Sequence, residues 1–180
     1  LLDKLKELRE VEDKRQERVF EKLIEPVYME LQLVHEDYMG SMRELQRMIP
    51  VESDDEEENI RKRKEAVQYL NDRRAKLSPV RIKLGTYHGA LLNNERELHR
   101  DSYRFVSAVL AYLYENVEGF EGTTRYHVFI SHLSEASSPN YRNKARASMR
   151  LLTAMIGACE ERWKEASTVF TSIQVKTLSR

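Results

Sequence analysis

Cysteine is almost absent from the sequence: Cys159 is the only one among 180 residues. A single cysteine excludes a disulfide framework within the chain and a structural zinc site built on cysteines. It suits a reducing compartment, so we expect a cytoplasmic protein. Glycine and proline are also scarce, with six and four residues, and the apolar 41% is rich in Leu, Met and Ala. This composition favours an all-α fold.

The sequence also lacks a net charge and a long apolar run. Thirty acidic and thirty basic residues give a formal charge of zero, so no global field attracts the protein to nucleic acid or anionic lipid. The longest nearly uncharged apolar run, 105–114, has about half the length that a membrane span needs. We therefore expect no transmembrane helix in these residues. Because the sequence begins at Leu1 rather than methionine, it is compatible with a piece of a longer protein.

Catalytic and metal-binding motifs are missing as well. The five histidines are His35, His88, His99, His127 and His132. None follows an acidic residue by three positions, which excludes the Glu-x-x-His pairs of di-iron helical bundles. The sequence contains no His-Glu-x-x-His, no Gly-x-Ser-x-Gly and no glycine-rich phosphate loop. We predict no cofactor, no metal site and no enzymatic activity; an active site of scattered residues around 126–132 is the alternative.

A heptad pattern organises what is present. Between Ile24 and Ile49 the large side chains recur at gaps of four and three, which puts them on one side of an α-helix. This seam consists of Ile24, Tyr28, Leu31, His35, Tyr38, Met42, Leu45 and Ile49. His35 is its polar member, and we predict that it sets the packing register as a neutral imidazole with a hydrogen-bond partner. A pH-responsive contact is the alternative.

Two further segments repeat the pattern. One consists of Val80, Leu84, Tyr87, Leu91, Asn94 and Leu98, then slips by one and continues as Ser102, Phe105, Val109 and Tyr112. The other consists of Met149, Leu152, Ile156, Cys159, Trp163, Ala166, Phe170 and Ile173. Asn94 is predicted to set the register in the same way as His35. We predict an elongated antiparallel bundle of three or four long helices with coiled-coil-like seams and a short helical insert, as a single domain over 1–180.

The first helix is predicted over 2–49, with a kink near 22–26. Pro26 lacks an amide hydrogen and clashes with the preceding helical turn. The heptad register slips at the same place, because Leu5 and Leu8 do not fall on the register of the following seam. The two parts of this helix are therefore predicted to pack separately.

An acidic connector is predicted over 50–58, with Pro50 closing the first helix. Ser53 and Glu56 have the spacing of a capping box, so a second helix is predicted over 54–78.

Pro79 is predicted to begin the next helix. Whether 54–116 forms two helices or one bent helix stays open. The stretch 117–140 is predicted as a loop followed by a short helix, and Pro139 opens the last long helix.

The N-terminal stretch 1–22 is the first candidate interaction surface. Nearly every side chain between Val11 and Val19 is ionisable, so we predict either a solvent-exposed helical extension or one layer of a coiled coil with another chain. The apolar positions of this surface are Leu2, Leu5, Leu8, Val11 and Val19.

A basic segment over 59–83 is the second candidate surface. Residues 50–58 hold six acids and no base, whereas 59–83 holds nine bases against two acids. These bases are Arg61, Lys62, Arg63, Lys64, Arg73, Arg74, Lys76, Arg81 and Lys83. A basic helix is able to follow a phosphate backbone or an anionic membrane surface. Only Tyr69 lies among them, so base stacking is not indicated, and a solvated helix face is the simpler interpretation.

These patterns lead to a functional hypothesis. We predict a protein–protein interaction or scaffolding module that oligomerises through its helical seams as part of a larger assembly. Its partner is a second copy or another protein, and no small-molecule substrate is indicated. The first alternative is nucleic-acid binding through 59–83, and the second is a curved bundle that binds a membrane surface.

Overall fold

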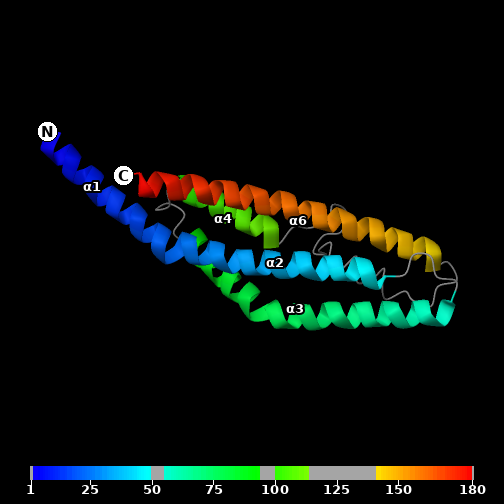
Figure 1. The fold of residues 1–180 in the computed structure, drawn as a ribbon. Coiled ribbons are helices and arrows are strands. Elements are labelled where there is room, and N and C mark those ends of the chain that lie inside the picture. Colours follow the sequence, from blue (N-terminus) through cyan, green and yellow to red (C-terminus); the bar gives the residue numbers. More distant parts are fainter. Residues whose placement is uncertain (1, 50–54, 94–99, 114–140, 180) are drawn as a thin grey trace.

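The computed structural model describes residues 2–49, 55–93, 100–113 and 141–179 (Figure 1). Nearly all of these residues are helical and none lies in a strand, which confirms the all-α prediction. The helices are α1 (Leu2–Val19), the π-helical turn η1 (Phe20–Ile24), α2 (Glu25–Met48), α3 (Glu56–Asn93), α4 (Arg100–Leu113) and α6 (Tyr141–Leu178). The short helix predicted within 117–140, Pro139 and Asn94 lie outside the described residues.

Pro26 explains the π-helical turn. It has no amide hydrogen for the carbonyl of Lys22, and its ring clashes with the preceding turn of a regular α-helix. The helix accommodates an extra residue within Phe20–Ile24, and the amide of Glu25 donates to the carbonyl of Phe20, five positions back. Figure 1 shows α1 leaving the axis of α2 at this turn. The predicted kink is confirmed, and the extra residue shifts the heptad register of α1 relative to that of α2.

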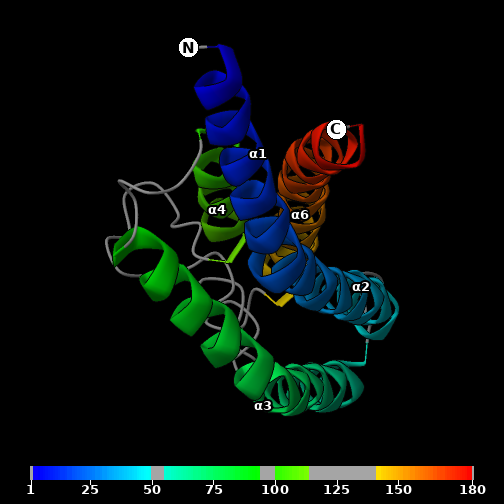
Figure 2. The same ribbon diagram turned by 90° about the vertical axis from the view of Figure 1, so that its left-hand side faces the viewer.

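α2 lies between α3 and α6 (Figures 1 and 2). On one side, Asp37 of α2 pairs with Arg73 of α3, and Glu30 of α2 pairs with Lys83 of α3. Because the higher number on one helix meets the lower number on the other, α2 and α3 are antiparallel.

On its other side α2 packs against α6. The rings of Tyr28 and Phe170 are stacked with their centroids 3.8 Å apart, and Arg43 lies 4.0 Å from Glu160. The numbers again run in opposite directions, so α2 and α6 are antiparallel as well.

α3 is a single helix that passes through Pro79. The prediction that a helix ends near Ser78 is therefore wrong, and the alternative of a bent helix holds across Glu56–Asn93. Figures 1 and 2 show α3 bent within its length. A proline inside a helix removes one hydrogen bond and crowds the carbonyl four residues earlier, and this produces a bend rather than an end when both halves are packed.

α4 runs back along the bundle instead of continuing α3. Asp101 at its start pairs with Lys176 near the end of α6, whereas Tyr112 near its end meets His35 in the middle of α2. α4 is therefore antiparallel to α6 and to α3. The seam positions Val80 to Tyr87 and Ser102 to Tyr112 therefore lie on two helices, α3 and α4, that run in opposite directions.

The core consists of two clusters along the long axis. The cluster next to η1 is built from Phe20, Ile24, Val27, Leu31, Val34, Leu84, Phe105, Ala108, Val109, Tyr112, Leu113, Ala166, Val169, Phe170 and Ile173. The other is built from Met42, Leu45, Ile49, Ala66, Leu70, Ala145, Leu152 and Met155. Every apolar or aromatic residue of the predicted seams in α2 and α6 lies in or against one of these clusters. Those two seams are confirmed.

Candidate interaction surfaces

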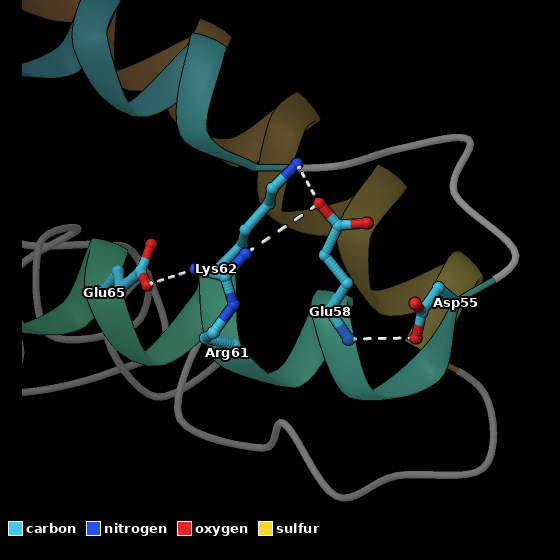
Figure 3. Close-up of polar contacts among 5 residues, drawn as sticks. All are labelled: Asp55, Glu58, Arg61, Lys62 and Glu65. Atoms are coloured by element: carbon cyan, nitrogen blue, oxygen red, sulfur yellow. Dashed lines mark hydrogen bonds and ion pairs between the residues drawn. The ribbon is translucent and has the colours of Figure 1, made fainter.

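The basic segment begins in a network of local ion pairs (Figure 3). The carboxylate of Asp55 caps α3 by accepting a hydrogen bond from the amide of Glu58 at 3.1 Å. The side chain of Glu58 lies 2.9 Å from Nζ of Lys62, and Arg61 is 3.0 Å from Glu65. The helix thus begins at Glu56 rather than Asp54, and the predicted cap Ser53 lies outside the described residues. Arg61 and Lys62 are matched by acids of their own helix.

Arg63 does not belong to the surface, because its side chain is only 1% exposed. It lies on a buried line of α3 with gaps of four and three that includes Asn59, Arg63, Ala66, Leu70, Leu77 and Leu84. Ile60 and Val67 of the same helix are only partly buried. The spacing from Leu84 and Leu77 back to Arg63 was readable in the sequence, but residue type gave no sign that an arginine would take a core position.

Arg73 and Lys83 are used inside the molecule. They pair with Asp37 and Glu30 across the contact between α3 and α2. The hydrogen bond to Glu30 raises the pKa of Lys83, so its ammonium is held in the charged form. These two bases tie α3 to α2.

The remaining bases do not form one continuous face in the described part of the chain. Lys64 and Lys76 are exposed, and neither has an ion pair among the residues that the structure describes. They are twelve positions apart, which separates them by about 120° around a helix. The side chains of Arg74 and Arg81 are outside the described set. Among the side chains of 59–83 that the structure describes, the exposed bases without an ion pair are therefore two separated lysines, which do not form a basic strip.

The N-terminal helix α1 extends past the rest of the bundle (Figures 1 and 2). Among the described residues its main neighbours are η1, with which it is continuous, and α6. Val11 is 66% exposed, whereas Val19 packs against the core cluster next to η1. The side chains of Leu2, Leu5 and Leu8 lie outside the described set. The first candidate surface is thus a helix with few neighbours.

One face of α1 and η1 carries an open depression of about 550 Å³. Its lining is Val11, Lys14, Arg15, Arg18, Val19, Lys22 and Leu23. These residues recur at gaps of three, one and three, which places them along one side of the helix. Four of the seven are basic and exposed, so the depression combines apolar side chains with a local positive charge.

His35 is partly buried on α2, beside aromatic side chains of α4 and α6. Its Nδ1 and the hydroxyl of Tyr112 are 3.0 Å apart and share a hydrogen bond, and its ring stacks on Trp163 with centroids 4.6 Å apart. Burial lowers the pKa of His35, against a weaker opposing effect of Glu160. Desolvation also raises the pKa of Tyr112, which keeps its hydroxyl protonated. The contact joins α2, α4 and α6.

The described residues contain neither a candidate metal site nor a candidate membrane-spanning helix. Within 2–49, 55–93, 100–113 and 141–179, no three His, Cys, Asp or Glu side chains gather closely enough to hold a metal ion. No helix in the same part of the chain has the length and apolar character to cross a membrane.

Comparison with known proteins gives no match: no family model, curated protein or solved structure resembles the chain. What the protein does must therefore be inferred from its own surfaces.

Proposed function

We propose that this protein is a protein–protein interaction module in which α1 is the contact helix. The chain 1–180 forms one elongated antiparallel bundle, and the bundle carries α1 as a protruding arm. The single observation that supports this most is the position of α1: it continues the central helix beyond its neighbours and keeps the apolar Val11 exposed between charged residues.

The energetics of an isolated helix favour the same conclusion. Helices shorter than about 12–15 residues are marginal in water, and most helical stability in proteins comes from packing of an apolar face. α1 has 18 residues, and the described part of the bundle covers little of it. Its continuity with α2 nucleates it, but a partner that covers its exposed face would stabilise it further.

Nucleic-acid binding through 59–83 has less support. Affinity for a phosphate backbone requires several free cations on one face. Arg63 is buried, while Arg73 and Lys83 neutralise acids of α2. Bases that are buried or paired are also not available to an anionic membrane surface, so the proposal of a membrane-binding bundle has less support as well.

The experiment is light scattering on the purified chain over a range of concentrations, together with pull-down of partners. Val11→Lys places a charge on the exposed apolar position of α1 and is expected to reduce association. Val175→Lys is the matched control, because Val175 is 58% exposed on α6, outside the proposed contact. A strict monomer at high concentration from which no partner is recovered would contradict the proposal, as would equal effects of the two substitutions.

A further inference from the structure

We infer that the partner of α1 is an acidic amphipathic helix of another protein, which lies along the outward side of α1, η1 and α2. This inference rests on the proposed function and specifies its partner. It follows from three features of that side: its position opposite the core, the three bases on its first half, and the two exposed apolar side chains on its second half.

Burial identifies the outward side of α1. Phe20 is buried and Gln16 is partly buried, so they mark the side of α1 that faces the bundle. Lys14 and Arg18 are each two positions from Gln16, which is about 200° around an α-helix. Lys22 follows Arg18 by four positions, and all three bases are exposed. These bases therefore form a line that points away from the bundle.

The outward side of α2 continues this line with apolar side chains. Met29 and Leu33 are each two positions from the fully buried Leu31, and they are 55% and 58% exposed. The buried side of the central helix runs through Phe20, Ile24 and Leu31, which all belong to one core cluster. The opposite side is therefore continuous as well, and the basic line and the apolar pair follow one another along it.

The three bases are not neutralised within the described part of the chain. Lys14, Arg18 and Lys22 have no ion pair with any described residue. Like charges one helical turn apart repel each other. The same three side chains line the depression of about 550 Å³, together with the exposed Val11. Carboxylates of a partner would relieve this repulsion, and its apolar side chains would enter the depression.

The arrangement of charge and apolar surface selects the class of partner. A nucleic acid would contact the bases through its phosphates and leave Met29 and Leu33 uncovered. A helix that lies on a membrane has its bases and its apolar residues on opposite faces, whereas here both lie on the same side. A partner helix with acidic residues in one half and apolar residues in the other matches both parts of the line.

The length of the line suits a single helix. At a rise of about 1.5 Å per residue, Lys14 and Leu33 are about 29 Å apart along the helix, so a partner helix of about 20 residues covers them. The flexible side chain of Met29 adapts to the shape of its partner. One pair of helices of this length buries less than a standard interface, so we expect micromolar affinity. Because the bases are exposed, the affinity should fall as salt increases.

Selection from a peptide library tests the chemistry of the partner. The probe is a displayed library of peptides of about 20 residues, with leucine at heptad positions and equal amounts of Glu, Lys, Gln and Ser elsewhere. It is selected on the full chain. We expect the recovered peptides to be enriched in Glu, with the enrichment concentrated in one half of each peptide. Enrichment in Lys, or no recovery above that on an unrelated protein, would overturn the inference.

Variants of the full chain locate the contact. Lys14→Gln, Arg18→Gln and Lys22→Gln together should weaken binding of a recovered peptide about tenfold or more. Met29→Ser with Leu33→Ser should weaken it to a similar extent. The matched controls are two pairs of substitutions at exposed positions outside the line: Lys64→Gln with Lys76→Gln, and Val175→Ser with Leu178→Ser. Fluorescence anisotropy measures the affinities, and circular dichroism verifies that all variants remain folded. Equal effects of test and control variants would overturn the inference.

Other occupants of this side are separate outcomes. Anionic vesicles and duplex DNA are titrated against the full chain, and sedimentation equilibrium measures its self-association. Binding of any of these that the basic triple variant abolishes and that a recovered acidic peptide does not displace would overturn the inference. The proposed function is tested independently. It stands if Val11→Lys weakens association with a second copy or a partner protein and Val175→Lys does not, whatever the library yields.

Discussion

Arg63 provides the sharpest test of how the structure uses the basic segment. The sequence places it between Lys62 and Lys64 in an uninterrupted basic run. The structure buries Arg63 to 1% exposure and leaves Lys64 exposed. Alanine at either position changes helix propensity by a similarly small amount, so the two substitutions form a matched pair.

The expected magnitudes differ widely. Arg63→Ala removes a long buried side chain and leaves a cavity. Such changes cost about 2–4 kcal/mol of unfolding free energy. Lys64→Ala removes an exposed side chain and should stay within about 0.5 kcal/mol of the wild type. For a chain of this size, the first change lowers the midpoint of thermal unfolding by roughly 5–15 °C.

Urea unfolding followed by circular dichroism measures this difference. Arg63→Met refills much of the volume that Arg63→Ala leaves empty, so it should lose less unfolding free energy than Arg63→Ala. Equal midpoints for Arg63→Ala and Lys64→Ala would refute the buried position. Arg63 would then return to the surface as a candidate for phosphate binding.

Three further predictions concern α2. Leu31→Ala should lower the free energy of unfolding by about 2–5 kcal/mol, because Leu31 is fully buried. Leu33→Ala should stay within about 0.5 kcal/mol of the wild type, because Leu33 is 58% exposed. Chemical denaturation compares the two variants. Asp37→Ala leaves the half-buried Arg73 without its carboxylate and should destabilise by about 1–3 kcal/mol, and an unchanged midpoint would show that the pair contributes nothing. Burial lowers the pKa of His35 below 6.5, so the folded state favours the neutral ring. The neutral ring therefore contributes its full stabilisation above pH 6.5, and this stabilisation is lost as the pH falls towards the pKa of the folded state. The His35→Gln chain should lose less stability than the wild type between pH 7.5 and pH 5.5, and identical losses would contradict the assignment.

Much of the fold could be predicted because the helical seams are regular. The gaps of four and three over Ile24–Ile49 and Met149–Ile173 identified the sides of α2 and α6 that enter the core. Pro26 located the kink through the hydrogen bond it cannot make. The path of the chain after α3 was not predictable in this way, because a heptad seam gives the buried side of a helix and not the direction of the next one.

The candidate surfaces were predicted less well, and for a different reason. A run of bases describes composition, whereas burial depends on the angular position of each base around the helix. Arg63 and Arg73 fall on the side of α3 that meets α2, so they became core and ion-pair residues. Conversely, the sequence showed that the heptad register of α1 differs from that of α2, but it did not show the extra residue of η1 between them.

The association of the full chain tests the central claim most directly. Val11 of α1 is 66% exposed and Val175 of α6 is 58% exposed, so the two positions form a matched pair on different helices. Sedimentation equilibrium, with and without a recovered partner protein, should show association that Val11→Lys weakens and Val175→Lys leaves unchanged. A chain that binds neither a second copy nor a partner, or equal effects of the two substitutions, would contradict the claim.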